Sequence, residues 1–128
     1  MFLQAPADIV AMVVRSSQID LMAKVLDATS LRHSAIAQNL ANANTPNYRR
    51  VEVQFETEVE RALEQGDVVV SARPNIVESQ DAVARADGNT VDIDVEISQL
   101  NKNSLLMAAA TQILALQLAQ LRSAISGK

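Results

Sequence analysis

The C-terminal part of the chain carries an apolar stripe with helical spacing that is longer than an ordinary globular helix needs. Apolar residues recur alternately three and four positions apart over residues 93–125, which places them along one side of a helix. A stripe sustained over more than four heptads is typical of a coiled-coil seam. We therefore predict a long C-terminal helix over residues 91–126, ended by Gly127. Its predicted seam-packing residues are Ile97, Leu100, Met107, Leu114, Leu118 and Leu121.

The start of this helix allows two interpretations, because residues 91–97 alternate apolar and acidic side chains with period two. The alternation indicates a strand, whereas acidic residues suit the positive end of a helix dipole. We expect an extended segment near Val91 that becomes helical by about Asp94. Asp92, Asp94 and Glu96 also suggest a calcium site, but the longer ligand series and the glycine of an EF-hand loop are missing. An acidic cluster at a helix start is the favoured interpretation.

A second long helix is predicted over residues 17–44, where apolar residues again keep the helical period. Ser17 is the predicted N-cap, with Asp20 in the first turn. Pro46 ends the helix, because the residue before a proline is steered away from the α region. His33 falls on the same stripe, and the predicted seam-packing residues are Met22, Leu26, Ile36 and Leu40.

Composition favours helices over sheets for the whole chain. Aromatic residues make up 2% of the 128 residues and there are three glycines, whereas β-sandwiches favour aromatic strands and glycine turns. Between the long helices, residues 45–90 predict a turn-rich loop, a short helix that contains Val59 and ends at Gly66, and an irregular stretch or short strands. Thr57 and Glu60 have the spacing of a capping box for that short helix. We predict one mainly helical assembly domain whose terminal helices pair as a coiled-coil-like bundle.

Residues 1–16 form an apolar N-terminal segment that we expect to pack on another surface. The segment resembles the core of a signal peptide, but it lacks a basic region before the core and a convincing cleavage site after it. The chain has no cysteine, so it has no disulfide framework. We expect no integral membrane segment, because no apolar run approaches the roughly 20 residues that span a bilayer.

Charge and side-chain chemistry argue against several classes of function. The net charge of −4 disfavours a nucleic-acid partner, because phosphate binding needs a cationic surface. His33 is the only histidine and lies on a helical stripe, where packing is a commoner role than catalysis. No nucleophile motif, glycine-rich phosphate loop or metal-ligand pair of histidine or cysteine is present. We therefore predict no catalytic, cofactor or metal residues and no small-molecule substrate.

The predicted helices must bury their apolar sides on something. Two helices could cover each other in a hairpin, which is the intramolecular interpretation. The C-terminal helix, however, is apolar around more than half of its circumference, as Leu105, Leu106, Ile113, Leu114 and Leu116 show. One antiparallel partner cannot cover so wide a face. We therefore predict that further chains pack against it.

Residues 39–48 read NLANANTPNY and form a turn-prone block after the first helix. This block, followed by Arg49, closely resembles the N-terminal signature of bacterial flagellar rod and hook proteins, N-(I/L)-A-N-x-x-T-P-G-Y-(K/R). Residues 87–92 (DGNTVD) and 103–105 (NSL) add to the resemblance, which covers residues 20–65 and 87–126. Asn47 departs from the usual glycine, and asparagine is the best non-glycine residue for a turn position with positive φ.

The resemblance implies a non-enzymatic structural subunit of the flagellar basal-body rod, of the proximal kind. Such subunits are exported through the flagellar type III apparatus without a cleaved signal. They then stack helically in the periplasm as the rod that transmits torque. Implied partners are copies of the chain, other rod proteins, the adaptor between rod and membrane ring, and the export gate. Implied subunit-contact residues are Asn39, Asn42, Asn44, Thr45, Pro46, Asn47 and Tyr48. The alternative is a cytoplasmic helical-hairpin adaptor or export chaperone.

Overall fold

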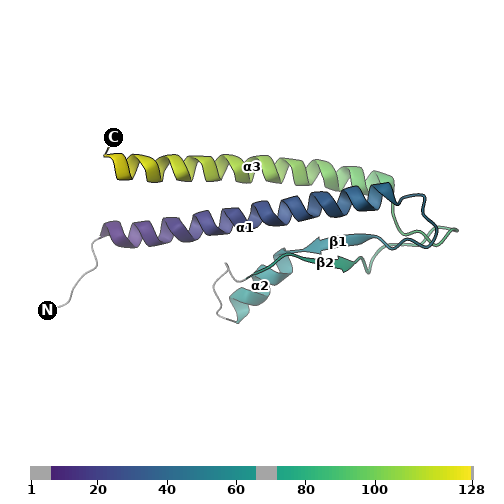
Figure 1. The fold of residues 1–128 in the computed structure, drawn as a ribbon. Coiled ribbons are helices and arrows are strands. Elements are labelled where there is room, and N and C mark those ends of the chain that lie inside the picture. The colour runs from purple at the N-terminus through teal and green to yellow at the C-terminus, as the bar shows by residue number, and fades with distance from the viewer. Residues whose placement is uncertain (1–6, 66–71, 128) are drawn as a thin grey trace.

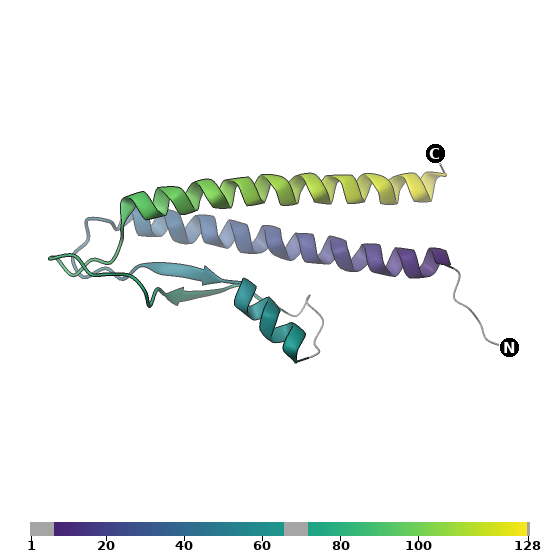
Figure 2. The same cartoon turned by 180° about the vertical axis from the view of Figure 1, so that it is seen from behind.

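A computed structural model describes residues 7–65 and 72–127, with the side chains of residues 8–16 outside that description. Within these residues the elements are, in chain order, α1 (Ala7–Ala41), β1 (Val51–Gln54), α2 (Glu56–Glu64), β2 (Asn75–Glu78) and α3 (Ile93–Ser126). The two long helices run antiparallel, side by side, and α1 lies between α3 and the layer formed by the strands and α2 (Figures 1 and 2). The predicted fold class is confirmed: two long terminal helices flank a short helix and short strands.

The first helix begins at Ala7, ten residues before the predicted start. Ser17 therefore lies inside α1, and the predictions that it caps the helix and that Asp20 occupies the first turn are wrong. No glycine or proline occurs over residues 7–41, so nothing in the sequence stops the helix from extending to Ala7. The helix ends at Ala41, three residues before the predicted end. The predicted packing of the apolar segment 1–16 concerns side chains outside the described residues.

The region between the long helices contains α2 and a small two-stranded antiparallel sheet, which we call the hairpin. Both lie against α1. β1 pairs with β2 in the register Val51↔Glu78 to Gln54↔Asn75. α2 begins directly after β1 with Phe55 at its N-cap and no side-chain capping bond, so the predicted capping box of Thr57 and Glu60 is wrong. Phe55 turns inward instead and packs in a cluster with Ala28, Ala62 and Ala72. Gly66, the predicted end of the short helix, lies outside the described residues.

Both predicted ends of the last helix are confirmed. Asp92 is extended, with φ −106° and ψ 114°, and its carboxylate accepts hydrogen bonds from the backbone N–H groups of Asp94 and Val95. Asp92 therefore acts as the N-cap that satisfies the first free donors of α3. At the other end Gly127 adopts the left-handed conformation with φ 66°, which is the usual glycine role after a helix.

The side of α3 that faces α1 differs from the predicted seam. The buried residues of α3 are Glu96, Asn103 and Ala110, whereas Ile97 and Leu118 of the predicted seam are 47% and 48% exposed. Met107 is also 40% exposed, and His33 is exposed on α1. The row of α3 that faces α1 therefore consists of small or polar residues. Each of them comes one position before an apolar or hydroxyl residue of the predicted row. Of the other predicted seam residues, Ile36 is buried, and Met22, Leu26, Leu40, Leu100, Leu114 and Leu121 are half-buried.

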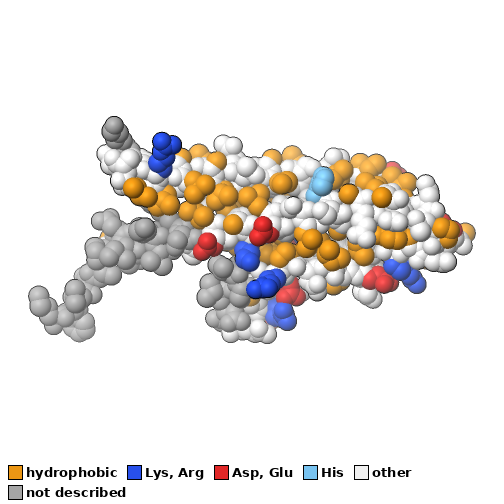
Figure 3. Space-filling model, viewed as in Figure 1, with side chains coloured by type: hydrophobic (Ala, Val, Ile, Leu, Met, Phe, Trp, Pro, Cys, Tyr) orange, Lys and Arg blue, Asp and Glu red, His pale blue; other side chains and the backbone are white. Residues whose placement is uncertain are grey.

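Because a different row of α3 faces α1, a wide apolar surface of α3 stays exposed. Hydrophobic side chains extend along α3 and α1 in the space-filling view (Figure 3). Residues 103–121 contain no charged side chain, and α3 is long and apolar enough to cross a membrane when judged by length and composition only. The prediction that no apolar run approaches a membrane-spanning length is therefore wrong. The serine, threonine and glutamine residues of α3 interrupt its apolar runs, but its average hydropathy remains high enough for a membrane-spanning helix.

Candidate assembly site

The turn block after α1, residues 42–48, forms a loop that we name the motif loop, and Asn39 fixes its base. The side chain of Asn39 is fully buried and pairs with the backbone of Val51 as a neighbouring strand would. Its Nδ2 donates to the Val51 carbonyl at 2.8 Å, and its Oδ1 accepts from the Val51 N–H at 3.0 Å. Nδ2 also donates to Glu96 at 3.1 Å, and the Tyr48 hydroxyl donates to Oδ1 at 3.3 Å. One amide thus joins α1, β1, α3 and the motif loop.

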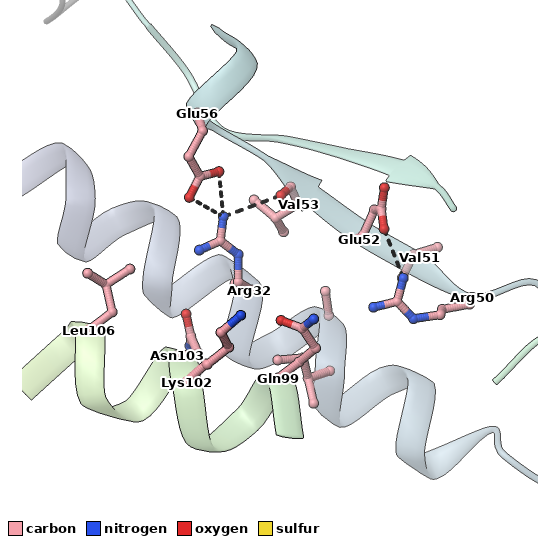
Figure 4. A pocket seen from close by; sticks show the side chains of 12 residues that line it. Arg32, Arg50, Val51, Glu52, Val53, Glu56, Gln99, Lys102, Asn103 and Leu106 are labelled. Carbon is pink, nitrogen blue, oxygen red and sulfur yellow. Dashed lines mark hydrogen bonds and ion pairs between the residues drawn. The ribbon is translucent and has the colours of Figure 1, made fainter. Parts of the chain in front are cut away.

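A buried ion pair beside this amide joins Arg50, the residue before β1, to α3. The Arg50 guanidinium contacts the Glu96 carboxylate, whose side chain is 0% exposed, while the side chain of Arg50 is 13% exposed. Arg50 also donates to Glu52 at 2.8 Å and to the Ser79 hydroxyl at 3.1 Å (Figure 4 shows the contact with Glu52). Burial lowers the pKa of Arg50, but hydrogen bonds to Glu96 and Glu52 outweigh it and hold the pKa above the usual value. The guanidinium therefore stays charged, and its contact with Glu96 fixes the start of α3 beside the strands.

Asn89 fixes the motif loop from the other side. Its side chain is fully buried, and Nδ2 donates to the carbonyls of Asn42, Ala43 and Thr45 at 2.8, 3.1 and 2.8 Å. Its Oδ1 accepts from the Val91 N–H at 2.7 Å. One residue of the DGN turn thereby adds a donor to three carbonyls just beyond the end of α1, which also accept from the Thr45 N–H, the Arg85 guanidinium and the Tyr48 N–H. The two sequence blocks of the resemblance, residues 39–48 and 87–92, are therefore the two halves of one interlocked structure.

Asn47 and Gly88 lie close together where the two halves meet. Asn47 has φ 61°, as expected for the residue that replaces a glycine, and it is the one non-glycine residue with positive φ among the described residues. Its N–H donates to the Asp87 carbonyl at 3.0 Å. Gly88 has φ 79°, and a Cβ there would lie 2.2 Å from Asn47 Oδ1. The positive φ therefore favours glycine at position 88, and any Cβ there would also force the Asn47 side chain to move.

Replacing Asn47 by glycine is expected to leave the fold intact and to raise the free energy of unfolding by up to about 1 kcal/mol, because glycine adopts positive φ without strain. Alanine at the same position should lower it by about 1 kcal/mol, since left-handed backbone costs roughly that much for an L residue. Urea denaturation of both variants measures the difference. Equal stabilities for the glycine and alanine variants would contradict the role of φ at this position.

The predicted contact residues divide into an internal and an external group. Asn44, Thr45, Pro46 and Asn47 are exposed at the tip of the motif loop, and Asn42 and Tyr48 are half-buried. Asn39 is fully buried, so the structure corrects its prediction as a subunit contact: its polar atoms are used inside the subunit. Burial, together with the nearby charge of Glu96, raises the pKa of the Tyr48 phenol. Tyr48 accordingly stays neutral and binds Asn39.

Two adjoining hollows flank α1 between α3 and the hairpin layer. The first has a volume of about 480 Å³ and includes Arg32, Glu56 and Asn103 in its lining. The second, of about 400 Å³, has mainly apolar walls that include Leu21, Val25 and Val59. Both share Arg32, Glu56 and Leu106, so they adjoin along α1, and we call the two together the groove.

The polar part of the groove shows both paired and unpaired groups (Figure 4). Arg32 binds Glu56 at 2.8 Å; burial would raise the pKa of Glu56, but its own backbone N–H and Arg32 together lower it. Asn103 donates through Nδ2 to the Thr29 carbonyl at 2.8 Å and is buried. Its Oδ1 has no hydrogen-bond partner among the described residues. This side of the subunit therefore offers a buried acceptor beside an apolar hollow.

Neither the groove nor the motif loop shows an arrangement of catalytic residues. The lining of the larger hollow contains no histidine or serine, and the described part of the chain holds no group of three or more side chains suited to a metal ion. Asp92 is used as a helix cap and Glu96 as an ion-pair partner, which agrees with the acidic cluster at a helix start. The arrangement can fix one conformation and present a surface.

Comparison with known proteins identifies similar chains in several bacteria. The flagellar basal body rod protein FlgB of Borrelia hermsii is 33% identical over 115 residues, covering 74% of this chain and 85% of that protein. The FlgB protein of Borreliella burgdorferi is 30% identical over the same shares of both chains. That of Bacillus subtilis is 23% identical over 123 residues, 88% of this chain and 95% of the relative. No family model matches the chain.

Proposed function

The chain belongs to the FlgB family of flagellar basal body rod proteins, and from this membership we propose that it assembles helically into the rod through its long helices and motif loop. A structural role in the basal-body rod is supported by the family as a whole. The observation that carries the finer proposal is the interlocked motif loop. Its base is held by Asn39 and Asn89, while residues 44–47 are exposed to solvent.

The rigid base is what makes the exposed tip suitable for a repeated contact. A loop that is ordered before binding loses little conformational entropy when a neighbour docks on it. α3 offers the second surface, because its large apolar side chains remain exposed in the single subunit. A subunit with both surfaces can transmit torque only if its neighbours hold it on more than one side. We propose this as the reason why the long helices and the loop act together.

The proposed partners are copies of the chain, other rod proteins, the adaptor that joins rod to membrane ring, and the flagellar type III export gate. We propose a periplasmic position in the basal body, reached without a cleaved signal peptide. The chain is proposed not to be an enzyme, in keeping with relatives that are named as rod proteins. A cytoplasmic adaptor or export chaperone is the competing function, and it predicts a soluble chain bound to a client.

Replacing Thr45 by arginine is expected to abolish swimming while changing the free energy of unfolding by no more than about 0.5 kcal/mol, because Thr45 is exposed at the tip of the motif loop. The wild-type chain should co-purify with basal bodies, and the variant should not. Motility plates, denaturation and fractionation of basal bodies measure the three outcomes.

The matched control is Thr57→Arg, which makes the same change at an exposed threonine of α2 outside the motif loop and should leave swimming normal. Two results would count against this function. Normal motility with the Thr45 variant would remove the motif loop from the assembly contact. A wild-type chain that stays wholly in the soluble cytoplasmic fraction would favour the chaperone.

A further inference from the structure

The groove has the shape and chemistry to receive a helix. Its floor is α1 from Leu21 to Ile36, a length of about 22 Å at the rise of an α-helix. One wall comes from β1 and α2, and the other from α3 at Gln99 and Leu106. The part lined by Leu21, Val25 and Val59 is apolar, and an apolar hollow between two walls is the common arrangement for binding an amphipathic helix.

The same chain carries an apolar strip of matching character on a different side of α3. This strip consists of Ile97, Met107, Leu118 and Ile125, which are 47%, 40%, 48% and 76% exposed. Given 100° of rotation per residue, they lie about 100–180° around α3 from Leu106, which lines the groove. The strip is therefore turned away from the groove of its own subunit. Lys102 and Arg122 bound a stretch without charged residues, so an apolar hollow could accept its central part without burying a charge.

We propose that the groove of one subunit receives the apolar strip of α3 of a second copy, an inference that rests on the proposed function and names the contact it uses. Two different surfaces meet in such a contact, which makes it heterologous. A heterologous contact that does not close into a ring continues as an open helical filament. The intramolecular seam of small and polar residues then serves a purpose, because it leaves the larger side chains of α3 for the neighbouring copy.

The buried residues of α3 support this division between two sides. Inside the subunit, Asn103 bonds to Thr29 and Glu96 pairs with Arg50. Ala110 is buried too, and its side chain is small. These bonds fix which side of α3 faces α1, as polar seam residues do in coiled coils. Once that side is fixed, the strip can only face outward. The subunit therefore presents its groove and its strip in a constant relative orientation, which a regular filament requires.

A photo-reactive amino acid at Glu60 tests the contact in assembled rods. Glu60 is an exposed residue of α2 at the edge of the groove, so the probe leaves the core unchanged. We expect a cross-linked dimer whose second peptide maps to α3 at the strip that contains Leu118. The double variant Met107→Glu, Leu118→Glu should reduce the yield by about tenfold or more, since about 1.4 kcal/mol of lost contact changes binding tenfold. The matched control is Leu105→Glu, which changes an exposed leucine of α3 outside the strip.

The outcomes separate this inference from the proposed function. A probe-bearing chain that is present in basal bodies but cross-links elsewhere, to another protein or not at all, overturns the groove contact and leaves the rod function standing. Absence of the wild-type chain from basal bodies overturns both. Purified chain that floats with phospholipid vesicles through α3, and loses this binding with Leu118→Glu, assigns the strip to a membrane and overturns the inference. Circular dichroism of each variant confirms that helix content is retained.

Discussion

Replacing Arg50 by alanine is expected to lower the free energy of unfolding by about 3–5 kcal/mol, because removal of one partner leaves a buried charge without compensation. The carboxylate of Glu96 is 0% exposed and would keep only the Asn39 amide as a direct side-chain partner. The loss should reach the motif loop as well, since Asn39 and Tyr48 belong to the same network. Urea denaturation followed by far-ultraviolet circular dichroism measures the change.

Arg49 provides the matched control for this substitution. Its side chain is 61% exposed and lies 3.8 Å from Glu78, so alanine there should cost less than about 1 kcal/mol. A double variant, Arg50→Met with Glu96→Leu, should be less destabilised than Arg50→Ala alone, because no unpaired charge remains in the interior. Equal losses for the Arg49 and Arg50 variants would show that the buried pair does not hold the hairpin to α3.

The long helices were predictable from the sequence because their periodicity is a local property. The acidic cluster at residues 92–96 and Gly127 marked the two ends of α3, because both preferences depend only on nearby residues. Asn47 was predictable in the same way, since a turn position that usually has glycine requires positive φ. The start of α1 at Ala7 was missed because Ser17 has the chemistry of a cap but no signal required the helix to begin there.

The pairing side of α3 could not be predicted from periodicity. Hydropathy favours the row that contains Ile97 and Leu118, and it ranks Glu96 and Asn103 as surface residues. What decides the pairing is a set of partners 46 to 74 residues away in sequence, namely Arg50 for Glu96 and the Thr29 carbonyl for Asn103. A buried polar residue is stable only where such partners exist, and no local pattern reports them.

The candidate site was predicted in outline, but its most important residues were not. The motif at residues 39–48 was located, yet Asn39 was assigned outward and is buried. Asn89 was noted only within residues 87–92 of the resemblance, and Arg50 was given no role. The signal that could have found Asn89 is its place in the second block of the resemblance, since two separated motifs of one family often meet in space.

Replacing Asn89 by alanine is expected to lower the free energy of unfolding by about 1–3 kcal/mol, because the buried N–H of Val91 loses its acceptor. The change removes the donor to the carbonyls of Asn42, Ala43 and Thr45 and the acceptor for the Val91 N–H. Aspartate should be worse than alanine, because it brings an acceptor with negative charge to three carbonyl oxygens. Denaturation measures stability, and hydrogen exchange at residues 42–48 measures loss of order in the motif loop.

Asn44 is the control that separates residues that stabilise the motif loop from residues that contact a neighbouring subunit. Its side chain is exposed at the tip, so alanine should change stability by no more than about 0.5 kcal/mol, although it removes a proposed contact. If Asn89→Asp were as stable as the wild type, the amide would not be the donor that fixes the loop. If Asn89→Ala lost stability but kept slow exchange at residues 42–48, Asn39 alone would suffice to order the loop. The proposed interlock requires that both asparagines hold it, because each satisfies backbone groups that the other does not reach.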